Sequence, residues 1–67
     1  MIKNRVRQVR LACEFTQEAL AQKVEVSRQT IIALEKGNYT PSVKLALQLA
    51  TALGKTVEEL FWIESKE

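Results

Sequence analysis

The 67-residue chain carries ten Lys and Arg against eight Asp and Glu, and a net charge of +2 is too small for a protein that coats nucleic acid non-specifically. The length suits one domain, expected over 1–67, and excludes two. One cysteine and no histidine exclude an internal disulfide and a histidine-ligated zinc site, so we expect no metal and no cofactor. Because no apolar run approaches the roughly 20 residues that cross a bilayer, we expect a soluble, cytoplasmic protein without a membrane partner.

Charge is distributed unevenly along the chain. Residues 1–10 hold four cations and no anion, whereas residues 58–67 hold four anions and one cation. We therefore expect one end of the molecule to be suited to phosphate and the other not.

Apolar periodicity and capping residues predict five helices and no strand. Apolar residues recur at steps of four, three and four from Ile2 to Cys13, which predicts a first helix over 3–13 with a buried, structural thiol at Cys13. Capping side chains predict the starts of the other helices. These helices are expected at 17–23 after Thr16, 28–36 after Ser27, 43–53 after Ser42, and from 57 after Thr56, where Glu59 completes a capping box. The fourth is apolar nearly all round and is expected to be central.

The helix expected at 28–36 has two chemically different sides. One side holds Ile31 and Leu34, which suit a core. The other holds Arg28, Gln29, Ile32, Ala33 and Lys36. Arginine matches the two acceptors of guanine, glutamine the adenine edge, and small or apolar groups the thymine methyl. These residues fit a base-reading surface, and they also fit a solvated helix face with one exposed isoleucine.

An enzymatic function is not expected. Without histidine the chain lacks the commonest general base, and it has no glycine-rich loop to hold a phosphate. Glu58 and Glu59 are adjacent, so they point to different sides of a helix, and their first-turn position suits the helix dipole.

The residues from Thr16 to Glu35, TQEALAQKVEVSRQTIIALE, resemble the helix-turn-helix of the phage repressor and Cro family, also called the XRE family. The resemblance continues through EKGNYTPS and ALGKTVEELF. It implies an all-α, compact five-helix, lambda-repressor-like DNA-binding domain with the helix-turn-helix motif at 16–35. Glu25 departs from the pattern, because the family often has glycine there, at a turn position that tends to need a positive φ.

The resemblance also implies roles for single residues. Gln17 resembles a glutamine that binds a phosphate and braces the glutamine of the recognition helix, here Gln29; an ordinary first-turn polar residue is the alternative. Arg10 and Glu35 resemble a structural ion pair that ties the first helix to the recognition helix. The bases would be contacted by Arg28, Gln29, Ile32 and Ala33. The phosphates would be contacted by Gln17, Lys36, Asn38, Tyr39 and Ser42, with packing of Tyr39 on Pro41 as an alternative and the free amides near Ser42 adding an anion contact.

These inferences lead to one functional hypothesis and one alternative. The hypothesis is a sequence-specific regulator of transcription, a repressor in preference to an activator, that binds a double-stranded DNA operator as a homodimer. Self-association is expected because so small a domain buries little surface alone, and because Phe61, Trp62 and Ile63 cannot all face one core. Trp62 is the expected anchor of this dimer interface. The alternative is a protein-interaction module, for example the DNA-binding half of an antitoxin.

Overall fold

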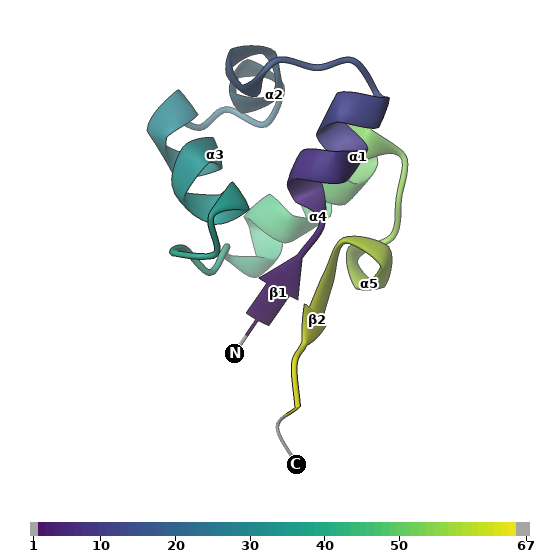
Figure 1. Cartoon of the computed structure of the whole chain (residues 1–67). Helices are drawn as coiled ribbons and strands as arrows, with labels where there is room; N and C mark the ends of the chain where they lie inside the picture. The colour runs from purple at the N-terminus through teal and green to yellow at the C-terminus, as the bar shows by residue number, and fades with distance from the viewer. Residues whose placement is uncertain (1, 66–67) are drawn as a thin grey trace.

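The computed structural model describes residues 2–65, with five helices and one two-stranded sheet (Figure 1). The elements in chain order are β1 (Ile2–Asn4), α1 (Val6–Ala12), α2 (Gln17–Lys23), α3 (Arg28–Glu35), α4 (Val43–Leu53), α5 (Val57–Leu60) and β2 (Phe61–Ile63). The five expected helices are confirmed. Lys66 and Glu67, two of the charges counted at the acidic end of the chain, lie outside the described residues.

Side-chain caps start four of the helices, as the sequence predicts. The hydroxyls of Thr16, Ser27, Ser42 and Thr56 each accept a hydrogen bond from the backbone N–H three residues later. Glu59 returns a bond to the Thr56 N–H at 2.8 Å, which completes the capping box. Gly54 ends α4 in the left-handed conformation, with φ +68°.

The core is formed mainly by α2, α3 and α4. Its buried members are Val6, Leu20, Ala21, Val24, Ile31, Leu34, Leu45, Leu49, Ala50, Leu53 and Leu60. The central position expected for α4 is confirmed, because it supplies Leu45, Leu49, Ala50 and Leu53 to this core. It is not covered on all sides, since Val43 is 77% exposed and Leu47 is 55% exposed. The apolar surface of α4 is therefore wider than the core that covers it.

The prediction of a chain without strands was wrong at both ends. β1 pairs with β2 in antiparallel register, with Ile2 opposite Ile63 and Asn4 opposite Phe61. The first helix consequently begins at Val6 and not at residue 3. Long-range bonds explain the difference: the Arg5 N–H donates to the Leu60 carbonyl at 3.0 Å, and no local periodicity indicates such a partner.

The predicted separation of a basic end from an acidic end was also wrong. The strand pairing places β1 and β2 side by side, although they are far apart in the sequence (Figure 1). Lys3 Nζ lies 3.4 Å from a carboxylate oxygen of Glu64. Lys3 of the basic segment thereby shares one surface with Glu64 of the acidic segment.

Cys13 is exposed, so the predicted burial of its thiol was wrong. α1 ends at Ala12, and Cys13 is its capping residue. Glu14 then adopts a positive φ of 63°, which turns the chain away from the helical direction. The apolar stripe read from the sequence therefore stops one turn earlier than expected.

Candidate nucleic-acid interface

A tight turn joins α2 to α3 and fixes their relative position. The Val26 N–H donates to the Ala21 carbonyl at 3.0 Å across this turn. Glu25 has a φ of 62°, the positive value expected where glycine is common. The two helices pack directly against each other, so the chain forms the helix, turn and helix that the sequence indicates.

The predicted two-sidedness of α3 is confirmed. Ile31 and Leu34 are fully buried, with 0% exposure. On the other side Arg28, Gln29 and Lys36 are exposed, and Ile32 and Ala33 are half-buried. This surface combines a guanidinium and an amide with two smaller apolar groups, and all four can be reached from solvent. Because Ile31 and Leu34 hold one side of α3 in the core, its other side is available to a ligand.

The remaining residues expected at phosphates lie in two places. Gln17 is half-buried at the start of α2. Lys36, Asn38, Tyr39 and Ser42 are exposed along the connection between α3 and α4. The Ser42 hydroxyl already accepts from the Leu45 N–H at 3.1 Å, so it caps α4. Tyr39 is 43% exposed and lines a hollow of about 190 Å³ with residues of the turn and of α4.

Three polar side chains connect α1, α2 and α3. Arg10 Nε donates to Glu35 Oε2 at 2.6 Å, and Arg10 Nη2 donates to Glu35 Oε1 at 3.3 Å. Gln17 Nε2 donates to the same Glu35 Oε1 at 3.2 Å. The structure thus brings Arg10 and Glu35 together, whereas no hydrogen bond within residues 2–65 joins Gln17 to Gln29. The sequence did not indicate the link from Gln17 to Glu35.

A polar hollow of about 550 Å³ opens beside this connection. It is lined by Arg10, Thr16, Gln17, Glu18 and Arg28. The Arg28 guanidinium and the Gln17 amide are suited to an anion, whereas the charge of Arg10 is paired with Glu35. Glu18 is the one carboxylate in the lining. The hollow lies next to the start of α3, where a base-reading surface would meet a DNA backbone.

The three residues expected at a dimer interface occupy β2 and differ in exposure. Phe61 is half-buried and packs against the core. Trp62 is 40% exposed, and Ile63 is 76% exposed. They are not consecutive positions of a helix, because α5 ends at Leu60 and the chain continues as a strand. Successive side chains of a strand point to opposite faces, which separates Trp62 from its two neighbours.

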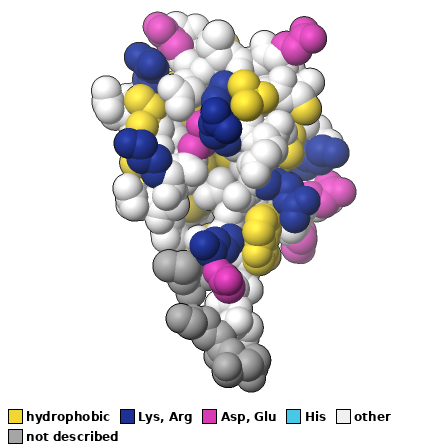
Figure 2. All heavy atoms as spheres, viewed as in Figure 1, with side chains coloured by type: hydrophobic (Ala, Val, Ile, Leu, Met, Phe, Trp, Pro, Cys, Tyr) yellow, Lys and Arg dark blue, Asp and Glu magenta, His cyan; other side chains and the backbone are white. Residues whose placement is uncertain are grey.

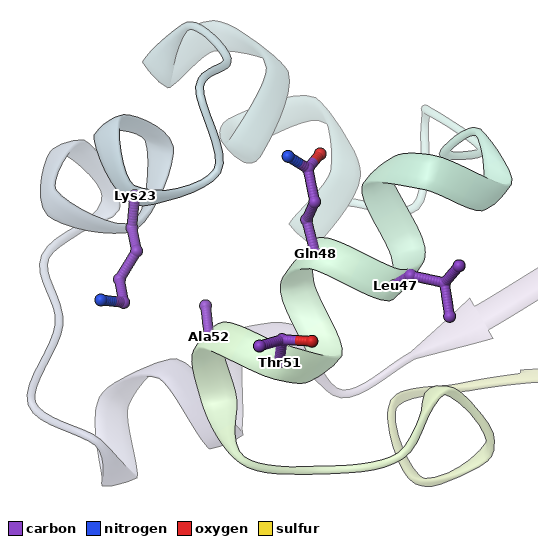
Figure 3. A pocket seen from close by; sticks show the side chains of 5 residues that line it. All are labelled: Lys23, Leu47, Gln48, Thr51 and Ala52. Carbon is purple, nitrogen blue, oxygen red and sulfur yellow. The ribbon is translucent and has the colours of Figure 1, made fainter.

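The face of the molecule shown in Figure 2 is chemically mixed, with Lys and Arg side chains interspersed among acidic and hydrophobic ones. A hollow of about 370 Å³ is lined by Lys23 of α2 and by Leu47, Gln48, Thr51 and Ala52 of α4 (Figure 3). It contains none of the residues expected to contact DNA.

Within residues 2–65, no three His, Cys, Asp or Glu side chains are grouped so that they could hold a metal ion. No helix in this described part of the chain is long and apolar enough to cross a membrane.

Comparison with known proteins identifies relatives over almost the whole chain. A protein-family model described as Helix-turn-helix matches residues 6–60. The chain is 48% identical over 66 residues to an uncharacterised HTH-type transcriptional regulator of Methanocaldococcus jannaschii, covering 98% of this chain and 100% of that protein. It is 42% identical over 65 residues to the HTH-type transcriptional regulator YgzD of Bacillus subtilis, covering 97% and 98%. Among solved structures it is similar to the restriction-modification controller protein C.AhdI of Aeromonas hydrophila, with a TM-score of 0.75, 33% identity, and coverage of 81% of this chain and 82% of that one.

Proposed function

This chain belongs to the helix-turn-helix family of DNA-binding transcriptional regulators, which are not enzymes, and we propose that it binds a double-stranded DNA operator with α3 in the major groove. The observation that carries this proposal is the exposed side of α3. Arg28 and Gln29 project from its first turn, while Ile31 and Leu34 anchor its other side in the core. A helix of this kind fits the width of the major groove.

The four residues proposed to contact bases have complementary chemistry. Arg28 can donate two hydrogen bonds to a guanine, and Gln29 can pair with the adenine edge. Ile32 and Ala33 are half-buried on the same side, where they offer apolar contact to a thymine methyl. The same helix face would therefore distinguish base pairs by both hydrogen bonding and shape.

Phosphate contacts would hold α3 in register. We assign them to Gln17, Lys36, Asn38, Tyr39 and Ser42. Lys36 supplies a positive charge at the end of α3, and the backbone amides that start α4 near Ser42 can receive an anion. Such contacts orient the protein without reading sequence.

A homodimer would place two copies of α3 on one operator. We propose that β2 forms its interface through Phe61, Trp62 and Ile63. Ile63 is an apolar side chain with 76% exposure, which a partner surface would cover. A two-fold dimer spaces its recognition helices by about 34 Å, one turn of DNA. We favour repression over activation. A repressor in the cytoplasm needs only to occupy its operator, and the DNA contacts proposed above are sufficient for that.

Fluorescence anisotropy of a labelled duplex across a salt series tests DNA binding. We expect affinity to fall steeply as salt rises, because phosphate contacts release counterions. Lys36→Ala should reduce the slope of log affinity against log salt by about 1. A folded wild-type protein that binds no duplex at low salt would contradict the proposal and favour the alternative of a protein-interaction module.

A further inference from the structure

Glu35 forms hydrogen bonds both with the buried Arg10 and with Gln17, a residue of the candidate interface. Its Oε1 atom accepts from both Arg10 Nη2, at 3.3 Å, and Gln17 Nε2, at 3.2 Å. Arg10 is held in turn by the Phe15 carbonyl, at 2.8 Å from Nη1. The guanidinium and the carboxylate are therefore fixed by several bonds at once.

Stability alone does not explain the buried pair. The side chains of Arg10 and Glu35 are 7% and 4% exposed, so both charges have lost most of their water. Replacing such a pair by apolar side chains of similar volume is often neutral or stabilising. A carboxylate at Glu35 is explained if it orients another polar group.

The group that Glu35 orients is the amide of Gln17. An amide nitrogen carries two N–H donors, and the bond to Glu35 uses one of them. Gln17 also lines the polar hollow beside Arg28. Fixing the amide nitrogen toward Glu35 leaves its second N–H for an acceptor outside the protein.

We propose that Glu35 is a positioning residue for DNA binding: its carboxylate, held by Arg10, orients the Gln17 amide so that the second N–H donates to a DNA phosphate at the hollow. The inference rests on the proposed DNA-binding function. Because the amide is ordered before DNA arrives, binding costs less rotamer entropy than it would for a free glutamine.

A double-mutant cycle tests the coupling. Arg10→Met/Glu35→Leu removes the carboxylate and fills its space with apolar groups, and Gln17→Ala is made in this background and in the wild type. Affinity for one duplex is measured by fluorescence anisotropy, and folding by thermal unfolding. We expect Gln17→Ala to weaken binding about ten-fold in the wild type, the size of one hydrogen bond to a charged group, and less than about two-fold in the background without the carboxylate.

Lys36→Ala is the matched control, because Lys36 has no part in this network. It should weaken binding equally in both backgrounds. If Gln17→Ala caused the same loss in both backgrounds, Glu35 would have no positioning role. If the wild type bound no duplex, the proposed function itself would be contradicted, and this role with it.

A second measurement needs neither DNA nor a substituted core. The order of each glutamine side-chain amide is measured by nitrogen relaxation in the free wild-type protein. We expect the Gln17 amide to be rigid and that of the exposed Gln29 to be mobile. Equal mobility of the two amides would overturn the inference even if the double variant failed to fold.

Discussion

Arg5 lies over the indole ring of Trp62, with its guanidinium carbon 4.8 Å from the ring centroid. This cation–π contact joins the residue after β1 to the middle of β2 and covers part of the indole within one chain. Trp62 was the expected anchor of a dimer interface, but it already packs against Arg5 of its own chain. Its neighbour Ile63 is 76% exposed and is the better candidate for a contact with a second copy.

The two residues should therefore respond differently to substitution. Ile63→Ser removes an exposed apolar side chain, so we expect it to shift a dimer toward monomer with little change in folding stability. Trp62→Ala also removes the contact with Arg5, a loss of about 0.5–2 kcal/mol, and should lower the melting temperature as well. Sedimentation equilibrium over a concentration series, with thermal unfolding of the same samples, measures both effects. A wild type that stays monomeric throughout would contradict the dimer and leave the DNA-binding proposal standing.

Substitutions on α3 separate base reading from phosphate binding. Arg28→Ala and Gln29→Ala should each weaken binding to the best site by about 1–3 kcal/mol and relax the preference at one base pair. Lys36→Ala should weaken all sequences alike. Affinities measured over a library of related duplexes distinguish the two patterns. An even loss across the library for all three variants would show that Arg28 and Gln29 do not read bases.

Glu25 lies in the turn with a φ of 62°, which is strained for a residue with a side chain. Glu25→Gly should relieve this strain and raise stability by less than about 1 kcal/mol, since glycine also adds freedom to the unfolded chain. Glu25→Ala is the control, because it removes the charge and keeps the strain. Thermal unfolding compares them. If both variants were equally stabilised, the charge of Glu25 and not its backbone conformation would be responsible.

The capping box of α5 predicts a pH dependence. The hydrogen bond from the Thr56 backbone lowers the pKa of Glu59, and Lys55 and Arg5 lower it further. A lowered pKa in the folded state stabilises the protein above the ordinary glutamate range, and this stabilisation is lost as the pH falls through the lowered value. We expect Glu59→Gln to reduce the melting temperature at neutral pH, and the difference from wild type to vanish in acid. A difference that did not change with pH would exclude the charge of Glu59 as its source.

The sequence predicted the parts of the fold that depend on local signals. Thr16 and Ser42 cap helices because a hydroxyl can accept from an amide three residues on, and Ile31 and Leu34 share the buried side of α3 because of its period. The same local rules failed for Asn4, which was expected inside a helix. Its amide nitrogen donates to the Leu34 carbonyl at 3.0 Å, a contact across 30 residues that fixes β1 outside α1.

The candidate site was likewise predictable only where local sequence signals or the family resemblance indicated it. Periodicity alone assigns Arg28 and Gln29 to the exposed side of α3, and the family resemblance suggested Arg10 and Glu35 as a pair. Neither signal indicated that Gln17 bonds to Glu35, because that contact depends on the packing of three helices. The strand at β2 was missed because three residues are too few to show alternation, although Phe61, Trp62 and Ile63 are types that favour strands.

Selection of bound duplexes from a random pool tests the central claim most directly, because it reports binding, specificity and operator symmetry together. With the folded wild-type protein we expect enrichment of a near-palindrome whose half-site centres lie about 10 base pairs apart. The positions that define each half-site should lose their preference when selection is repeated with Arg28→Ala or Gln29→Ala. A pool that retains its starting composition after repeated selection would contradict sequence-specific DNA recognition by α3.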